Sequence, residues 1–267
     1  MRPGGALRIA QLSDLHLVPA GLRLYGAVDT PGAVERALSR LAALEPRPDL
    51  LVLSGDLVND GGVAEYRWLR TRLEACGLPW RAMPGNHDRR DALRTVFGDQ
   101  GFAGGELCCQ RFDMGAGTLL LLDSVIEGEE GGEVAAAQLA WLDAACPDDR
   151  PVLLFMHHPP FAIGVEAMDA IGCRGGERLA AWLATRPQVE AVLCGHVHRF
   201  AVSRFAGRPA ITAPSPAHQI ALDLRPGAPL AYTDEPGGLL FHLWTPGVSL
   251  LSHYLPVAAA PVHPYID

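Results

Sequence analysis

The sequence contains no lysine, so all 22 of its basic residues are arginine. The absence of lysine excludes a lysine Schiff base and a phosphate-binding loop of the Walker-A type, because both need the lysine ammonium group. It also excludes those two-metal amidohydrolase sites in which a lysine bridges the ions. A metallo-β-lactamase site is excluded as well, since the sequence has no H-x-H-x-D-H run.

Charge, cysteine and long apolar runs are also scarce. Charged residues make up 19% of the 267 residues, the formal net charge is −8, and no arginine-rich run is present. A nucleic-acid groove or a membrane-binding face is therefore not expected. The six cysteines form no C-x-x-C pair, which is typical of reduced cysteines in a cytosolic protein. Without a leader or an apolar run of about 18 residues, the sequence predicts a soluble cytoplasmic protein.

Apolar residues are plentiful, at 49% of the chain, which is enough for a continuous core. Short apolar runs alternate with amphipathic helical patterns, and this alternation indicates an α/β fold with buried strands. The predicted strands span residues 8–13, 49–54, 80–83, 118–122, 152–156 and 189–194; the predicted helices span 31–44, 63–76, 135–145 and 176–184. After residue 199, closely spaced Gly and Pro turns predict β-hairpins.

Polar side chains that bind metals follow almost every predicted strand. They are Asp14 and His16, Asp56, Asn86 and His87, His157 and His158, and His196 and His198. Ligand sites of α/β sheets lie beyond the carboxyl ends of the strands, so these five loops are expected to meet at one place. Asp, Asn and His suit divalent ions such as Zn²⁺, Fe²⁺ and Mn²⁺.

Each motif alone also has an ordinary structural interpretation. Gly55-Asp56 and Gly85-Asn86-His87-Asp88 are typical of turns, and a single D-x-H or H-x-H pair is more often a satisfied loop pair than a ligand pair. The conjunction favours a metal site, because all the motifs fall at strand ends and together include six of the ten histidines.

Five motifs in this order resemble the full signature of the calcineurin-like metallophosphoesterases: Asp14-x-His16, Gly55-Asp56, Gly85-Asn86-His87-Asp88, His157-His158-Pro159 and Gly195-His196-x-His198. The resemblance covers residues 8–200. Within this superfamily the sequence is most similar to class III cyclic-nucleotide phosphodiesterases and bacterial glycerophosphodiesterases. Further matching segments are Leu24-Tyr25-Gly26, Val58-Asn59, Ala167-Met168-Asp169 and Ala217-His218-Gln219. The fold implied is a four-layer αββα sandwich with two mixed β-sheets and a small cap segment.

The resemblance also implies two divalent transition-metal ions, with Fe, Mn and Zn as candidates. Asp14, His16, Asp56 and His198 would hold one ion, and Asp56, Asn86, His157 and His196 the other, with Asp56 bridging the two. In the family the ligand lies two residues before the proline, which favours His157. Strand alternation turns its neighbour His158 away, so His158 is expected to be structural or to support a ligand.

The reaction implied is hydrolysis of a phosphodiester by in-line attack of a hydroxide that bridges the two ions. His87 is expected to hydrogen-bond the phosphoryl oxygen or to protonate the leaving alkoxide. Asp88 is expected either to orient a histidine or to serve only as a turn residue. Substrate contacts are expected from Asn59, Tyr25 and His218, for which packing or turn formation is the competing interpretation. Arg89 and Arg90 are better explained as exposed residues at a helix start.

The expected substrates are small organic diesters, either 3',5'-cyclic nucleotides or glycerophosphodiesters. The alternatives are a phosphomonoesterase or other phosphohydrolase with the same site, and a binding scaffold that has lost its ligands. The scaffold is disfavoured because all seven ligand positions and His87 hold suitable residues. We expect one domain over residues 1–267, with a cap or oligomerisation segment at 161–175 and a β-rich part at 200–267. A homo-oligomer is compatible with that division.

Overall fold

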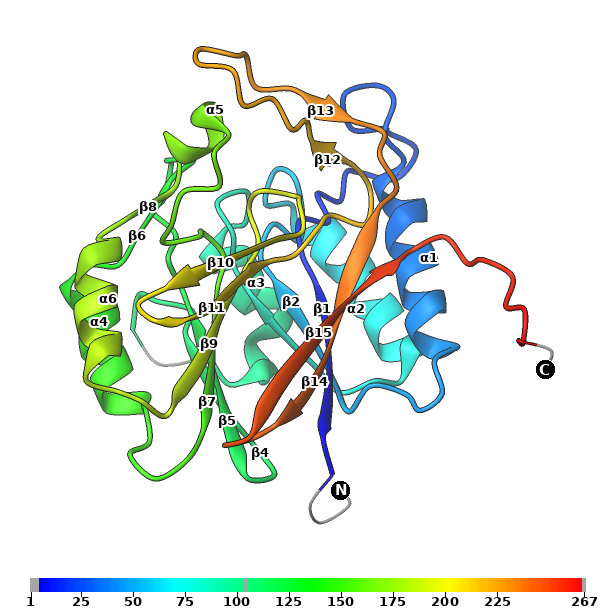
Figure 1. Cartoon of the computed structure of the whole chain (residues 1–267). Helices are drawn as coiled ribbons and strands as arrows, with labels where there is room; N and C mark the ends of the chain where they lie inside the picture. The colour runs from blue at the N-terminus through cyan, green and yellow to red at the C-terminus, as the bar shows by residue number, and fades with distance from the viewer. Residues whose placement is uncertain (1–4, 103–104, 266–267) are drawn as a thin grey trace.

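Two β-sheets face each other and are covered by helices on their outer faces, which gives four layers (Figure 1). The computed structural model describes residues 5–102 and 105–265 of the chain. The layered arrangement confirms the predicted α/β sandwich with two mixed sheets. Among the described residues, every helix is too short or too polar to cross a lipid bilayer.

The first sheet has five strands in the order β15-β14-β1-β2-β3. They span Leu7–Leu12 (β1), Leu50–Ser54 (β2), Trp80–Met83 (β3), Gly238–Thr245 (β14) and Ser249–Pro256 (β15). The strands β1, β2 and β3 are parallel, whereas β14 pairs antiparallel with both β1 and β15. Three helices pack on the outer face: α1 (Thr30–Ala42), α2 (Val63–Cys76) and α3 (Arg90–Phe97).

The second sheet has six strands in the order β10-β11-β9-β7-β5-β4. They span Gln110–Met114 (β4), Gly117–Leu122 (β5), Val152–Met156 (β7), Val189–Cys194 (β9), Ala201–Phe205 (β10) and Arg208–Thr212 (β11). The four central strands are parallel, and β4 and β10 run antiparallel at the two edges. Its outer face is covered by α4 (Ala136–Ala145) and α6 (Gly176–Ala184).

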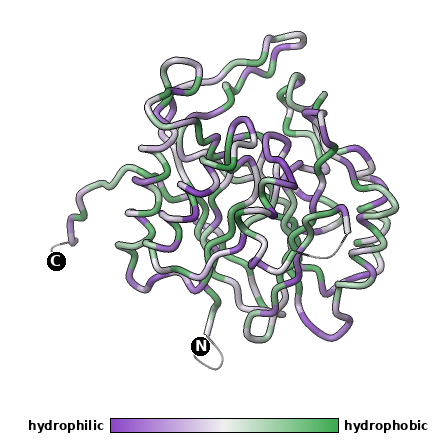
Figure 2. Tube along the Cα trace, turned by 180° about the vertical axis from the view of Figure 1, so that it is seen from behind, coloured by the Kyte–Doolittle hydropathy of each residue, from purple (hydrophilic) through white to green (hydrophobic). Residues whose placement is uncertain are grey.

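The core follows directly from the apolar strands. Every residue of β2, β5 and β7 is buried, as expected for strands covered on both faces. One cluster fills the space between the sheets and under α4 and α6, and a second fills the space under α1, α2 and α3. Figure 2 shows the hydrophobic stretches running through the strands, with hydrophilic stretches mainly in loops and on helix surfaces.

Several short elements lie above the carboxyl ends of the strands. They are β6 (Gly132–Glu133) paired with β8 (Cys173–Arg174), α5 (Glu166–Asp169), and β12 (Gln219–Ile220) paired with β13 (Tyr232–Thr233). The 3₁₀ turn η1 (Gly98–Gln100) follows α3. Figure 1 places α5 and the β12–β13 hairpin at the top of the molecule, on the side where the strands end. The predicted cap segment 161–175 therefore contains α5 and β8, while the single-domain division stays a prediction.

Candidate metal centre

The carboxyl ends of β1, β2, β3, β7 and β9 meet at the top of the two sheets, and the predicted ligands lie on the loops that follow. Backbone hydrogen bonds hold these loops together, from Asp14 N to Gly55 O (3.0 Å) and from His16 N to Asp56 O (2.9 Å). The second sheet is tied in by His196 N, which donates to Asp14 Oδ1 at 2.9 Å. The site thus joins both sheets.

Four buried side chains form the first group: Asp14, His16, Asp56 and His198, whose ligand atoms all lie within 4.8 Å of one another. The Nε2 atoms of His16 and His198 are 3.0 Å apart. His16 Nε2 lies 3.4 Å from Asp56 Oδ2, and His198 Nε2 lies 3.5 Å from Asp14 Oδ1. Two imidazole nitrogens and two carboxylates therefore face a common centre, which is a donor set suited to a divalent transition metal.

A second group lies on the other side of Asp56. His157 Nε2 is 3.3 Å from Asp56 Oδ2, and His196 Nδ1 is 3.1 Å from Asn86 Oδ1. His158 also lies within 4.8 Å of His157 and His196. However, its Nδ1 contacts Ser124 Oγ at 2.9 Å and its Nε2 contacts the carbonyl of Glu130 at 3.2 Å. With both nitrogens engaged, His158 is a poorer ligand than Asn86.

Unpartnered polar atoms test whether these residues fit a metal. Asp14 Oδ2, His157 Nε2 and His198 Nδ1 are buried and have no hydrogen-bond partner among the described residues. A buried polar atom left unpaired costs about 1–3 kcal/mol, more when it is charged. Bound cations would satisfy Asp14 Oδ2 and His157 Nε2, so the residues fit a metal centre, whereas His198 Nδ1 faces away from it.

Three of the ring nitrogens that face away from the centre are held by oxygen atoms. His157 Nδ1 contacts the carbonyl of Ser54 at 2.8 Å, and His196 Nε2 contacts the carbonyl of Ile171 at 3.0 Å. His16 Nδ1 lies 3.3 Å from Asn59 Oδ1. Histidines that bind metals usually donate their second N–H in this way, which fixes the tautomer and the orientation of the ring.

The backbone of the site adopts an uncommon conformation. Positive φ angles occur at Asp14 (57°), His16 (45°), Asp56 (51°), His196 (71°) and His198 (48°). Non-glycine residues rarely adopt the left-handed region, although Asp and His do so more readily than most. Such residues persist where the surrounding structure enforces them, often at functional sites. Sequence reasoning found these five residues but not their conformation.

Glycines give the ligands room to approach each other. A Cβ atom added at Gly85 would meet Asp56 Oδ1 and the backbone nitrogen of Asp56, and would lie 2.7 Å from His157 Nε2. A Cβ atom at Gly195 would meet Ser13 Oγ and would lie 3.1 Å from Asp14 Oδ2. The glycines before Asn86 and His196 are therefore needed by the packing of the site as well as by their turns.

We expect Gly85→Ala to weaken Mn²⁺ binding by more than about tenfold, since the added methyl group displaces Asp56 and His157 from a close-packed site. The melting temperature measured in EDTA should change by only a few degrees. Isothermal titration calorimetry measures the affinity, and Gly98→Ala is the matched control because a Cβ there meets nothing within 4 Å. Equal Mn²⁺ affinity in the two variants would contradict the packing argument.

The buried carboxylates and imidazoles shift one another's pKa values. Burial lowers the pKa of a histidine, but the negative charges of Asp56 and Asp14 prevail and raise the pKa of His157 to about 9. Burial likewise raises the pKa of Asp14 to about 7. Burial lowers the pKa values of His16 and His196 to about 3, so those two rings are neutral at physiological pH.

These shifts predict that protons compete with the metal. Only neutral imidazole and ionised carboxylate bind a cation, so metal binding should release protons. Near pH 8 it should release about one proton, from His157. Below pH 7, where Asp14 is also protonated, it should release about two. We therefore expect Mn²⁺ affinity to rise with pH up to about pH 9. Calorimetry in two buffers of different ionisation enthalpy measures the released protons; an affinity that stays constant from pH 6 to 9 would contradict the prediction.

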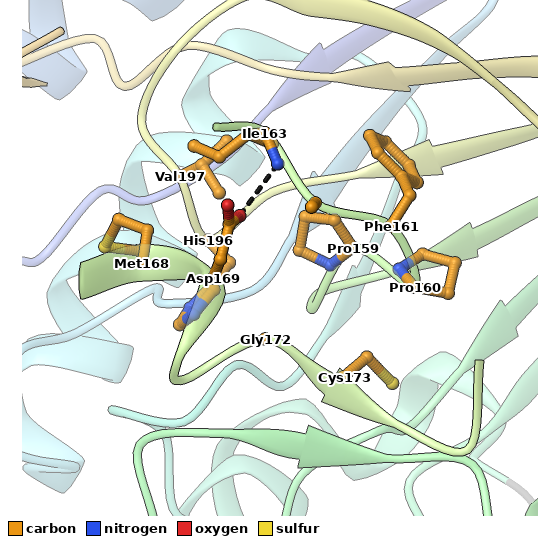
Figure 3. A pocket seen from close by; sticks show the side chains of 11 residues that line it. Pro159, Pro160, Phe161, Ile163, Met168, Asp169, Gly172, Cys173, His196 and Val197 are labelled. Carbon is orange, nitrogen blue, oxygen red and sulfur yellow. Dashed lines mark hydrogen bonds between the residues drawn. The ribbon is translucent and has the colours of Figure 1, made fainter. Parts of the chain in front are cut away.

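The cap segment 161–175 packs against His196. Asp169 holds its loop by accepting hydrogen bonds from Ile163 N (2.7 Å) and Gly164 N (3.0 Å), the first of which is drawn in Figure 3. Between this loop and His196 lies a cavity of about 160 Å³. Because the carbonyl of Ile171 binds His196 Nε2, the cap also fixes a candidate ligand. Sequence patterns gave no indication of that backbone contact.

The candidate ligands open onto a pocket of about 380 Å³. Its lining contains His87 and two of the three predicted substrate contacts, Tyr25 and His218. The lining also contains the carboxylate of Glu130 and the less polar side chains of Met168, Ile171, Ile220, Leu230, Ala231 and Tyr232. The third predicted contact, Asn59, lies beside this pocket. Its side chain faces His16 and its carbonyl lies 2.8 Å from His87 Nδ1, so in this structure it supports two site histidines.

Asp88 contacts backbone amides and a tyrosine. Among the described residues no hydrogen bond joins it to His87. It accepts instead from Gly85 N (2.8 Å), Leu57 N (3.1 Å) and the hydroxyl of the buried Tyr66 (2.6 Å). The Asp88 carboxylate thereby ties the loop after β2, which carries Asp56, to the loop after β3, which carries Asn86. These contacts agree with the turn interpretation of Asp88 and add a contact to α2.

The two arginines after this turn point to other partners. Arg90 forms a bidentate ion pair with the buried Asp123, at 2.7 and 2.9 Å, and Arg89 lies beside Asp91 at 3.3 Å. None of the described residues that line the pocket is an arginine. His242, outside the site, is fully buried between Ser252 Oγ (2.7 Å) and Gln11 Oε1 (3.1 Å).

Comparison with known proteins finds relatives that match most of the chain. Residues 7–200 match the family model described as calcineurin-like phosphoesterase. The glycerophosphodiester phosphodiesterase GpdQ of Enterobacter lignolyticus is 33% identical over 260 residues, which cover 92% of this chain and 92% of the relative. The 3',5'-cyclic adenosine monophosphate phosphodiesterase CpdA of Pseudomonas aeruginosa is 36% identical over 194 residues, which cover 72% and 69%.

Solved structures share the fold at low sequence identity. A purple acid phosphatase from yellow lupin superposes with a TM-score of 0.68 and 14% identity, over 98% of this chain and 54% of that chain. A dimetal phosphatase from Danio rerio gives a TM-score of 0.62 and 16% identity, over 94% and 99%. The four-layer arrangement is therefore common to proteins that differ widely in sequence.

Proposed function

The chain belongs to the calcineurin-like phosphoesterase family, and from that premise we propose that it is a phosphodiesterase acting on small organic diesters. Phosphoesterases of this family use two divalent metal ions, and the Asp and His groups of the site are able to hold such a pair. In this proposal Asp14, His16, Asp56 and His198 hold one ion, and Asp56, Asn86, His157 and His196 hold the other.

One observation carries the proposal: buried carboxylate and imidazole atoms face each other without hydrogen-bond partners at the base of an open pocket. Such a site is unfavourable in a protein that binds no cation. A pair of bound divalent ions supplies a water activated near neutral pH and positive charge for the phosphoryl oxygens. The residues of the chain shape the pocket and position the side chain that donates a proton.

His87 is placed to handle a proton at the reacting phosphate. Its Nδ1 lies 2.8 Å from the carbonyl of Asn59, which can only accept, so Nδ1 carries a proton. The other nitrogen, Nε2, is then free to exchange a proton with the leaving group, and the ring lines the pocket. Its backbone N–H donates to Asp56 Oδ1 at 2.9 Å, which ties the position of His87 to the bridging carboxylate.

The charge of the pocket favours diesters over monoesters. A monoester phosphate is a dianion near neutral pH and is commonly held by arginine, whereas a diester carries a single negative charge. The described lining contains no arginine, and both arginines near the site are paired with carboxylates. The identity of two relatives as phosphodiesterases agrees with this charge argument.

A substrate panel tests the proposal. We expect the Mn²⁺-loaded protein to hydrolyse bis-p-nitrophenyl phosphate faster than the monoester p-nitrophenyl phosphate, and EDTA to remove both activities. Cyclic AMP and glycerophosphoethanolamine then rank the two natural diester classes by kcat/KM. A monoester turned over faster than every diester would favour the phosphomonoesterase alternative. The absence of any metal-dependent turnover would refute the proposal that the chain is an enzyme.

A further inference from the structure

Two tyrosines from distant parts of the chain stack at the mouth of the pocket. Tyr25, in the loop between β1 and α1, and Tyr232, the first residue of β13, have ring centroids 5.0 Å apart and an interplanar angle of 28°. Their exposed fractions are 61% and 39%, and both rings line the pocket. Large aromatic faces left open beside a candidate active site are available to a ligand.

The backbone of Tyr25 is held in a conformation that tyrosine rarely adopts. Its φ is +54°, within a tight turn closed by a bridge between Leu24 and Val28. For a bulky residue a positive φ is a genuine outlier, and such strain persists where the structure enforces it. In this turn the ring of Tyr25 lies against the ring of Tyr232, so the strained backbone holds one member of the pair.

Tyr232 is anchored from both ends of its hairpin. The tip of the hairpin contacts the cap, because Gly227 N donates to Glu166 Oε2 at 2.7 Å. At its base Arg199 donates to the carbonyl of Ile220 (2.7 Å) and pairs with Glu235 (2.8 Å). The tyrosine pair is thus a preformed surface, and little conformational freedom is lost when a ligand binds to it.

His218 connects the pair to the candidate metal ligands. Its buried ring is edge-on to Tyr25 and Tyr232, with centroids 5.9 and 5.7 Å away. On its other side the ring centroid of His198 is 4.6 Å away. A continuous aromatic wall therefore runs from the metal centre to the pocket mouth, within reach of an ester group whose phosphate lies at the metals.

Resting on the phosphodiesterase function proposed above, we propose that Tyr25 and Tyr232 select the ester group that stays on phosphorus, favouring one with a flat, uncharged aromatic ring. The lining also holds the apolar side chains of Met168, Ile220 and Leu230 and one further carboxylate, that of Glu130. The nearly parallel tyrosine rings present a platform on which another flat ring can stack.

Three diesters with the same leaving group test this specificity. In bis-p-nitrophenyl, methyl p-nitrophenyl and p-nitrophenyl choline phosphates, water adds to phosphorus and p-nitrophenolate leaves, so only the remaining group differs. We expect kcat/KM to be highest for the aromatic diester. Tyr232→Ala and Tyr25→Ala should lower it about tenfold for that diester, mainly through KM, and change it less than about twofold for the methyl diester, as expected for loss of one stacking contact.

Matched variants separate stacking from structural damage. Tyr232→Phe keeps the ring and should retain the preference, and Leu222→Ala alters an exposed residue of the same hairpin that does not line the pocket. An equal loss for all three diesters, or a loss confined to the choline diester, would overturn the proposal while leaving the phosphodiesterase function intact. Wild-type protein inactive on all three diesters would overturn both.

Discussion

Replacement of Asp56 by alanine is expected to abolish metal-dependent hydrolysis of bis-p-nitrophenyl phosphate. Its Oδ2 atom lies 3.4 Å from His16 Nε2 and 3.3 Å from His157 Nε2, between the two groups of candidate ligands. In the proposed assignment it is the one residue shared by both ions. Removing it also takes away the acceptor of the His87 backbone N–H, so the position of His87 is disturbed too.

Metal analysis of the same variant distinguishes loss of the site from loss of the fold. Asp56→Ala should bind at most one Mn²⁺ per chain, and Asn86→Ala should behave similarly because it removes a ligand of one ion. Asp99→Ala is a matched control, since Asp99 is an exposed carboxylate paired with Arg70 far from the pocket. Unchanged turnover in Asp56→Ala or Asn86→Ala would contradict the assignment of these residues as metal ligands.

His87→Ala should retain both ions and slow turnover by about 10²–10⁴-fold, the usual contribution of a general acid. The metals should stay because the bond from His87 to Asp56 comes from the backbone, which alanine preserves. What is lost is the ring, whose Nδ1 is fixed by the carbonyl of Asn59. Metal content and kcat measured on the same preparation test both halves of the prediction.

The leaving group sharpens the test of His87. A proton donor matters most for a poor leaving group, so the loss should be larger for cyclic AMP than for bis-p-nitrophenyl phosphate, whose p-nitrophenolate leaves without a proton. Equal losses for the two substrates would point instead to stabilisation of the phosphoryl oxygen. Loss of a metal ion from His87→Ala would make His87 a ligand.

The strands were predictable because their residues are apolar on both faces. Residues 50–54 and 152–156 are buried throughout, and their predicted bounds agree with β2 and β7 to within a residue. Only the start of helix α3, at Arg90, was expected. Its extent was not predicted because eight residues are too few for a clear periodic pattern, although Leu93, Val96 and Phe97 pack into the core. The edge strand β4 alternates polar and apolar residues over a short run that gave no recognisable signal.

The meeting of the five ligand loops was predictable from where the strands end, because the loops after parallel strands lie at one edge of a sheet. The contacts that support the candidate ligands were not predictable, since they involve backbone atoms or distant segments. The carbonyl of Ile171 behind His196 has no sequence signature, and neither has the contact from Tyr66 to Asp88. Tyr232 was missed for the same reason: only the fold brings it beside Tyr25.

The five candidate ligands with left-handed backbone also set a limit on how this protein can be engineered. A left-handed non-glycine residue costs about 1 kcal/mol, so together they cost about 5 kcal/mol, comparable with the whole net stability of many domains. Selection for thermal stability alone, with metal withheld, should therefore enrich glycine at positions such as Asp14 and His198. The resulting protein should be more thermostable but inactive. A library meant to keep the enzyme has to be screened with metal and substrate present from the first round.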